Sequence, residues 1–134
     1  MATLRSAFLC QSARPHDNGL ISALGINIRE MMVPAYPALL RATFVAVVDL
    51  DGAGLEALED RHWSAWVRGG DEVMARIDGS SHPPDTPSAA GLPPYVTLVF
   101  ELVFEVQRSA LLEVGLDMDQ STLTTLPLNV RTAS

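Results

Sequence analysis

Apolar and polar residues alternate along much of this sequence, and the alternation is clearest over residues 95–106. Every second residue from Val96 to Val106 is apolar, whereas the opposite set contains Thr97, Glu101 and Glu105. A period of two is typical of a β-strand with one face in a core and the other face in water. The pattern therefore predicts a half-buried strand.

Two further alternating segments, residues 112–118 and 126–130, are predicted to form a hairpin. Their apolar sides coincide if residues 119–121 make a three-residue loop, whereas a two-residue loop would misalign them. The predicted inward pairs are Val114 with Leu126 and Leu112 with Leu128.

Residues 61–69 and 72–78 give a second predicted hairpin, with its loop at residues 69–71. In this register every inward pair is apolar, whereas a two-residue turn would bury the charge of Glu72. The predicted inward pairs are Val67 with Val73, Ala65 with Ala75, and Trp63 with Ile77. The predicted outward pairs are Arg68 with Glu72, Trp66 with Met74, and His62 with Asp78.

Three more strands are expected upstream, separated by turn-forming Pro, Asn and Gly residues. They cover Leu4–Ala13, Leu20–Glu30 and Leu39–Leu50. One helical turn is expected at residues 54–60, and a flexible crossover loop rich in Pro, Ser and Gly at residues 79–94. The sequence thus predicts an all-β fold, an antiparallel two-sheet β-sandwich of about eight strands with at most one short helix, in a single domain over residues 1–134.

The composition narrows the classes of function. The chain has 134 residues, 48% of them hydrophobic, which suits one domain with one core. Sixteen acidic and nine basic residues give a net charge of −7, which disfavours binding to nucleic acid. No apolar stretch is long enough for a membrane span, and residues 1–11 lack the features of a secretory signal. The single cysteine, Cys10, suits a reducing compartment, so a cytoplasmic protein is expected.

Both ends of the chain resemble a known protein family. Residues 7–10, Ala-Phe-Leu-Cys, and residues 18–25, Asn-Gly-Leu-Ile-Ser-Ala-Leu-Gly, are similar to the start of a widespread bacterial family of uncharacterised small β-sandwich proteins. Residues 123–130, Leu-Thr-Thr-Leu-Pro-Leu-Asn-Val, are similar to its closing strand, whereas residues 108–111 depart from its usual Gly-x-Tyr. The resemblance implies a compact bacterial β-sandwich and supplies no catalytic residues.

Two Asp-x-Asp pairs are the candidate metal ligands. Asp49 and Asp51 follow one predicted strand, and Asp117 and Asp119 end another. Carboxylates at the loop mouths of a sandwich can coordinate Ca²⁺ through several oxygens. Solvated turns are the commoner role of such pairs, and the sequence does not show that the two pairs meet. We therefore expect no cofactor and no tight metal site.

The other reactive side chains form no recognisable catalytic motif. His16, His62 and His82 lack the spacing of a zinc site. Cys10 lies among apolar residues without a basic neighbour, so a buried, inert thiol is expected. His62 beside Asp78 would be an oriented general base only with a nucleophile nearby, and the sequence suggests none. We expect that the protein is not an enzyme.

Trp66 and Met74 are the candidate interface residues. The predicted register turns both outward, away from Trp63, and exposed Trp and Met residues are common in protein interfaces. The loop at residues 79–94 can equally cover Trp66. The sequence therefore favours a non-enzymatic module that binds a protein partner or self-associates as a homo-oligomer. The alternatives are a small-ligand or Ca²⁺-binding sandwich and an enzyme with an unfamiliar site.

Overall fold

The computed structural model describes residues 2–16, 21–50, 61–81 and 95–132, which form ten β-strands and no helix. The strands are β1 (Ala2–Cys10), β2 (Ser12–Pro15), β3 (Ile21–Leu24), β4 (Glu30–Val33), β5 (Ala38–Leu50), β6 (Arg61–Gly69), β7 (Glu72–Ser81), β8 (Tyr95–Val106), β9 (Ala110–Met118) and β10 (Ser121–Thr132). The predicted all-β class is confirmed.

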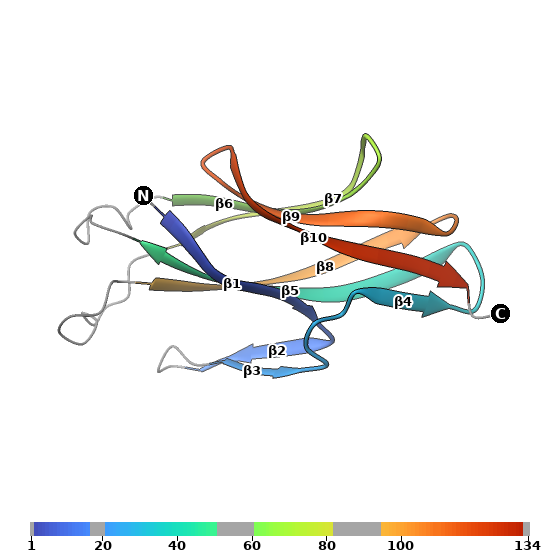
Figure 1. The fold of residues 1–134 in the computed structure, drawn as a ribbon, viewed down its shortest axis with the longest axis horizontal. Helices are drawn as coiled ribbons and strands as arrows, with labels where there is room; N and C mark the ends of the chain where they lie inside the picture. Colours follow the sequence, from blue (N-terminus) through green and yellow to red (C-terminus); the bar gives the residue numbers. More distant parts are fainter. Residues whose placement is uncertain (1, 17–20, 51–60, 82–94, 133–134) are drawn as a thin grey trace.

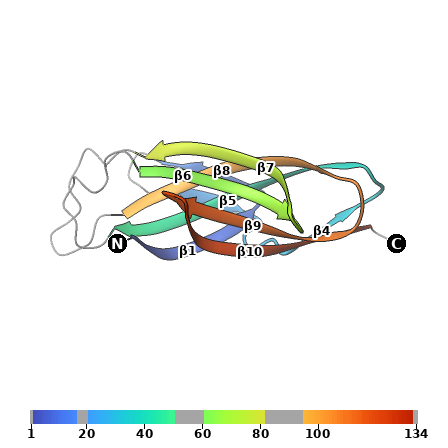
Figure 2. The same cartoon turned by 90° about the horizontal axis from the view of Figure 1, so that it is seen from above.

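The strands form two main sheets and a small third one, stacked in layers (Figure 1). The five-stranded sheet has the order β4, β10, β9, β6, β7, and the three-stranded sheet has the order β1, β5, β8. The hairpin of β2 and β3 covers the side of β1 and β5 that faces away from the five-stranded sheet (Figure 1). Seen from above, the strands of both main sheets run along the length of the molecule (Figure 2). The predicted two-sheet sandwich is therefore present.

The two main sheets enclose an apolar core, and the central pair of β5 and β8 shows why the alternation is so clear. The inward residues of both strands are apolar, whereas Arg41, Glu101 and Glu105 face outwards. The buried inward residues of these strands are Ala42, Phe44, Ala46, Val48, Phe100, Leu102, Phe104 and Val106. Because burial stabilises a fold by about 25 cal/mol per Å² of apolar surface, this layer holds the two sheets together.

Two of the predicted strands are each divided in the structure, which raises the number of strands from about eight to ten. Leu4–Ala13 breaks at Gln11 into β1 and β2, and Leu20–Glu30 breaks after Leu24 into β3 and β4. Gly25 has a φ of 65°, a left-handed conformation that favours glycine and interrupts the strand. The break at Gln11 lets the chain leave the three-stranded sheet and form the covering hairpin.

One pair of strands is parallel, where the sequence analysis expected antiparallel pairs only. β4 runs alongside the end of β10, with Met31 opposite Val130 and Val33 opposite Thr132. Val33 is buried, so this short strand contributes to the core. A parallel pair requires a long connection through other elements, and local alternation does not reveal such a partner.

The hairpin of β9 and β10 has the predicted pairs but a different turn. Val114 lies opposite Leu126, and the second predicted pair is also present, so this part of the prediction is confirmed. The turn contains only Asp119 and Gln120, because Met118 lies directly opposite Ser121. A bulge at residue 123 then restores the register that a two-residue turn would misalign.

This turn leads to a prediction for Gln120→Gly. Asp119 and Gln120 have φ values of 48° and 74°, and a turn with two positive φ values favours glycine at its second position. We expect the free energy of unfolding, measured by urea denaturation, to rise by about 0.5–1 kcal/mol. Ser121→Gly, one residue later in the strand, should lower it instead. A Gln120→Gly variant less stable than the parent would contradict the assigned turn.

The hairpin of β6 and β7 has a register different from the predicted one. Its turn is the two-residue segment 70–71, and Val67 lies opposite Ala75 where Val73 was predicted. A bulge at Met74 accounts for the shift. The other predicted inward pairs are wrong for the same reason, since Ala65 lies opposite Ile77 and Trp63 opposite Gly79. With the bulge, the hairpin has a two-residue turn and the charge of Glu72 is still not buried. The prediction did not include a bulge.

The predicted helical turn and the predicted crossover loop fall largely in parts of the chain that the structure does not describe. The helical turn at residues 54–60 lies outside the described residues. Residues 79–81 belong to β7 and not to the predicted crossover loop, and residues 82–94 also lie outside the described residues. The part of the chain that the structure describes contains no helix capable of crossing a membrane.

Candidate functional sites

The described members of the two Asp-x-Asp pairs belong to different sheets. Asp49 is near the end of β5 in the three-stranded sheet, whereas Asp117 is near the end of β9 in the five-stranded sheet and Asp119 lies in the turn that follows. Asp51 lies outside the described residues. The described carboxylates have these partners: Arg5 to Asp49 with N–O distances of 2.9 and 3.1 Å, the Thr122 hydroxyl to Asp117 at 2.8 Å, and the His62 backbone N–H to Asp119 at 3.2 Å.

These contacts favour a structural role for the three described carboxylates. Ca²⁺ takes about six to eight oxygen ligands, so a site needs several carboxylates close together. Within the described ranges, no group of three or more His, Cys, Asp or Glu side chains is placed to hold a metal ion. The hypothesis of a Ca²⁺ site at the two Asp pairs therefore receives no geometric support from the described residues.

His62 and Asp78 lie close together on the sheet surface. Their Nε2–Oδ1 distance is 3.9 Å, with side chains 64% and 53% exposed. The two residues are diagonal neighbours, because His62 lies opposite Ser80 and Asp78 opposite Ser64. The directly opposite pair that the predicted register implied is therefore wrong. An exposed contact of this kind is typical of a sheet surface and contributes little to stability.

The burial predicted for Cys10 is confirmed. Cys10 lies on the side of β1 that faces away from the main core, and its thiol donates a hydrogen bond to the carbonyl of Ser12 at 3.4 Å. Burial raises the pKa of the Cys10 thiol. The thiolate, which is the nucleophilic form, is therefore disfavoured at neutral pH.

Trp66 faces away from the main core, as predicted, but its side chain is buried. Only 5% of the residue is exposed, although it lies on the side of β6 opposite to Trp63. Met74 packs partly against the main core, because the bulge at this residue removes it from the outward position beside Trp66. Arg76 lies opposite Trp66 in its place. The two candidate interface residues therefore do not form the exposed patch that the predicted register implied.

Gly115 provides the space that the Trp66 ring occupies. Gly115 lies opposite Trp66 on β9, and a Cβ atom at Gly115 would be 2.1 Å from Cζ2 of the ring. The guanidinium carbon of Arg68 is 4.9 Å from the ring centroid, and Arg68 pairs with Glu113 at 2.6 Å. The indole is thus held on the outer face by a glycine and by a cation–π contact. This arrangement explains how a tryptophan is buried outside the core.

The free edge of β8 carries a row of outward backbone groups. β8 is an edge strand whose only ladder partner among the described strands is β5. The Leu9 carbonyl accepts a hydrogen bond from the Ile28 N–H, so the backbone groups of Leu9 point away from β5. The N–H and C=O groups of successive residues point to opposite edges of a strand. The direction at Leu9 therefore also fixes the direction for each paired residue of β5 and, through β5, of β8. In β8 the backbone groups of Phe100 and Leu102 face β5. Those of Val99, Glu101, Val103 and Glu105 face outwards.

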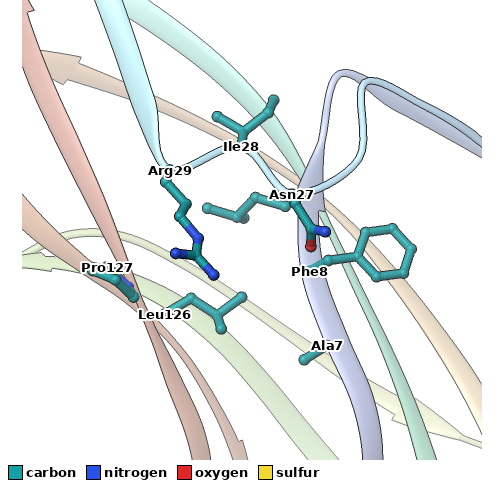
Figure 3. Close-up of a pocket in the computed structure, with 8 residues that line it drawn as sticks. Ala7, Phe8, Asn27, Ile28, Arg29, Leu126 and Pro127 are labelled. Atoms are coloured by element: carbon teal, nitrogen blue, oxygen red, sulfur yellow. The ribbon is translucent and has the colours of Figure 1, made fainter.

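A pocket of about 270 Å³ lies between β1 and β10, which belong to different sheets. Its lining residues are Ala7, Phe8 and Leu9 of β1, Asn27, Ile28 and Arg29 of the segment before β4, and Leu126 and Pro127 of β10. The Arg29 side chain extends towards Leu126, and Asn27 lies near Phe8 (Figure 3). The walls are mainly apolar, with one guanidinium and one amide among them.

Residues 27–29, which we name the bridge segment, connect the two main sheets beside this pocket. The Ile28 N–H donates to the Leu9 carbonyl on β1 at 2.9 Å. The Asn129 N–H on β10 donates to the Arg29 carbonyl, also at 2.9 Å. The bridge segment is therefore fixed at both sides of the pocket.

Pro127 marks the part of β10 that β4 does not cover. The pairing with β4 begins at Asn129, whose N–H points towards the bridge segment. Backbone directions alternate, so the nitrogen of Pro127, two residues earlier, points to the same side. Proline has no N–H to donate, which suits it to a strand edge without a partner. The edge of β10 is thus blocked beside the pocket.

This pocket was not predicted from the sequence. Its residues come from three segments that are far apart in the chain, and alternation reports only which residues share a face within one strand. The available signals were Pro127 inside a predicted strand, where proline indicates an edge, and Asn27, close behind Gly25. Neither signal shows which elements meet.

Comparisons with known proteins assign no family to the chain. No model of a known protein family matches it, and no curated protein matches it. The resemblance to the bacterial family stays a prediction from the sequence.

Proposed function

We propose that the protein is a non-enzymatic binding module that takes up an extended segment of a protein partner along the free edge of β8. The observation that carries the proposal is the row of outward backbone groups at residues 99–105. An extended segment that pairs with this row gains main-chain hydrogen bonds, and its alternate side chains contact the outer face of the sheet.

Within the described residues, β8 lacks several of the features that usually protect an edge strand, and its charges are limited to Glu101 and Glu105. Protected edges are short, carry proline, charged side chains (lysine above all) or a bulge, or are covered by another segment. β8 has 12 residues without proline or lysine, and its pairing with β5 contains no bulge. Val103 on this strand is 43% exposed, and Leu39 on the neighbouring strand is 72% exposed. The edge therefore presents both backbone groups and apolar surface to a partner.

The charges beside the edge favour a basic partner over a second copy of the chain. In an antiparallel pair of two β8 strands centred on Val103, Glu101 of each copy lies opposite Glu105 of the other copy. Like charges in opposite positions destabilise a strand pair. A partner strand with Lys or Arg at two positions four residues apart would instead contact both glutamates favourably. The net charge of −7 further favours a basic segment.

Val103→Pro tests this proposal. The Val103 N–H points outwards, so proline at this position removes a donor from the edge and leaves the hydrogen bonds to β5 in place. The probes are two labelled peptides of alternating Thr and Val, one with two lysines and one with two glutamates four positions apart. By fluorescence anisotropy, we expect the lysine peptide to bind about tenfold more tightly than the glutamate peptide, and Val103→Pro to remove this binding.

Val103→Thr is the matched control, because it changes the same side chain and keeps the N–H; it should bind like the parent. Exchanging the charges with Glu101→Lys and Glu105→Lys should reverse the preference between the peptides, which tests the proposal even if the proline variant unfolds. Equal binding of both peptides, or full affinity in folded Val103→Pro, would rule out strand addition here. Binding of a second copy in place of the peptides would show self-association instead.

We also propose a cytoplasmic location in a bacterium, which rests on the sequence. The single cysteine of the chain is buried and unpaired with another cysteine, and all nine basic residues are arginine, as is typical of a GC-rich bacterial genome. Fractionation of the native cells followed by immunodetection tests the location. Recovery in an exported fraction would contradict it.

A further inference from the structure

The pocket between β1 and β10 is an open hollow at the surface, where Asn27 and Arg29 are exposed, and it combines mainly apolar walls with a cationic group. Ala7, Leu9 and Leu126 contribute aliphatic walls. Arg29 extends its side chain towards Leu126 (Figure 3). Ligand sites in proteins typically have this composition, with mainly apolar walls and a few polar groups that fix the orientation of the ligand. The pocket thus has the features of a site for a small amphipathic molecule.

The charge of Arg29 has no carboxylate partner among the described residues. Three other described arginines, Arg5, Arg68 and Arg131, each form an ion pair with an Asp or Glu. Within the described part of the chain, the hydrogen bond of Arg29 is made by its carbonyl, which anchors its backbone to β10. A guanidinium presents a planar set of donors that matches the two oxygens of a carboxylate. Arg29 is therefore both positioned and available for an anionic ligand.

Asn27 adds a second polar group to the pocket. Its φ of 68° lies in the left-handed region, which asparagine adopts more readily than most residues. This conformation places the residue at the start of the bridge segment, with its side chain near Phe8 (Figure 3). An amide N–H₂ can donate a further hydrogen bond to a carboxylate oxygen.

We propose that this pocket binds an apolar monocarboxylate, with Arg29 and Asn27 at the carboxylate and the aliphatic walls around the body of the ligand. The volume of about 270 Å³ holds about ten non-hydrogen atoms at the packing density of protein interiors. Two sources supply this chemistry, a free short-chain carboxylic acid and the C-terminal carboxylate of a peptide with an apolar last residue. The site is independent of the free edge of β8.

The probes are hexanoate for the free acid and N-acetyl-leucine for the peptide terminus. Each is titrated into the folded, isotope-labelled protein to about 50 mM, which covers millimolar dissociation constants, and binding is followed by amide chemical shifts. We expect saturable shifts at Leu9, Ile28 and Leu126. Hexanamide, which keeps the apolar chain and removes the charge, should bind about tenfold more weakly than hexanoate. The carboxylate that binds more tightly shows whether the site prefers a free acid or a peptide C-terminus.

Arg29→Gln should weaken carboxylate binding about tenfold, whereas Arg108→Gln, an exposed arginine outside the pocket lining, should leave it unchanged. Asn27→Gly keeps the left-handed backbone and removes the amide, so it should weaken binding without disturbing the fold. The proposal is overturned if neither carboxylate produces saturable shifts, if hexanamide binds as well as hexanoate, or if Arg29→Gln keeps the parent's affinity.

Discussion

Trp63→Ala is expected to lower the free energy of unfolding by about 3–5 kcal/mol, measured by urea denaturation. Trp63 is 1% exposed and is the largest of the fully buried side chains in the described core. Its replacement removes the transfer free energy of the indole and leaves a cavity between the two main sheets. Because domains are stable by only about 5–15 kcal/mol, the variant should have a much reduced melting temperature.

The neighbouring substitution His62→Ala is the control, because His62 is exposed on the same strand. We expect it to change the free energy of unfolding by no more than about 0.5 kcal/mol. If Trp63→Ala does not fold, Trp63→Phe gives a smaller loss in the same direction. A loss below about 1 kcal/mol for Trp63→Ala would contradict the burial of this residue between the sheets.

Gly115→Ala is expected to destabilise the protein by about 1–3 kcal/mol, although alanine usually suits a strand better than glycine. The added Cβ would lie 2.1 Å from the Trp66 ring, so the ring must leave its place over β9. Leu111→Ala is the control on the same face of the same strand, and because Leu111 is 69% exposed, the change should be within about 0.5 kcal/mol.

The double variant Trp66→Ser with Gly115→Ala separates this contact from a general effect of the glycine. Trp66→Ser alone should also reduce stability, because the indole is buried. In the absence of the ring, Gly115→Ala should lower the free energy of unfolding little or not at all. The loss in the double variant should therefore be much smaller than the sum of the losses in the two single variants. Additive losses would show that the ring does not lie over Gly115.

The alternation of apolar and polar residues predicted which side of most strands is buried, but it was wrong beside the bulge of β7, where Val73 is 48% exposed and Met74 packs against the core, and it did not give every partner. It was sufficient for β9 and β10, where Val114 pairs with Leu126 as predicted. It was insufficient for β6 and β7, because a bulge at Met74 shifts the pairs without changing which residues of β6 are buried. A bulge depends on the local fit of two strands, and no residue in either strand marks it in the sequence.

The candidate sites were harder to predict than the fold. Trp66 was correctly placed on the outer face, but its burial depends on Gly115, which comes from a strand far along the chain. The pocket around Arg29 depends on the parallel pairing of β4 with β10, a contact between distant segments. Patterns within one strand report the direction of a side chain, whereas a site depends on which strands are neighbours.

The two proposed sites lie on opposite edges of the three-stranded sheet, since β8 and β1 are its outer strands. The β8 edge is formed by backbone groups and glutamates, whereas the pocket beside β1 contains a guanidinium and apolar walls. A basic extended segment and a small carboxylate therefore do not compete for the same groups. Peptide binding should remain unchanged in Arg29→Gln, and hexanoate binding should remain unchanged in Val103→Pro.

The parallel pair of β4 and β10 has a consequence for the newly made protein on the ribosome. Glu30 and Arg131, which form an ion pair across these strands, are 101 positions apart. At a synthesis rate of about 5–20 residues per second, the paired part of β10 is synthesised roughly 5–20 s after β4. During this interval the Arg29 carbonyl has no Asn129 N–H to accept from, so the bridge segment is held at one side only. A nascent chain therefore completes the wall of the carboxylate pocket late, after the central strands have been synthesised.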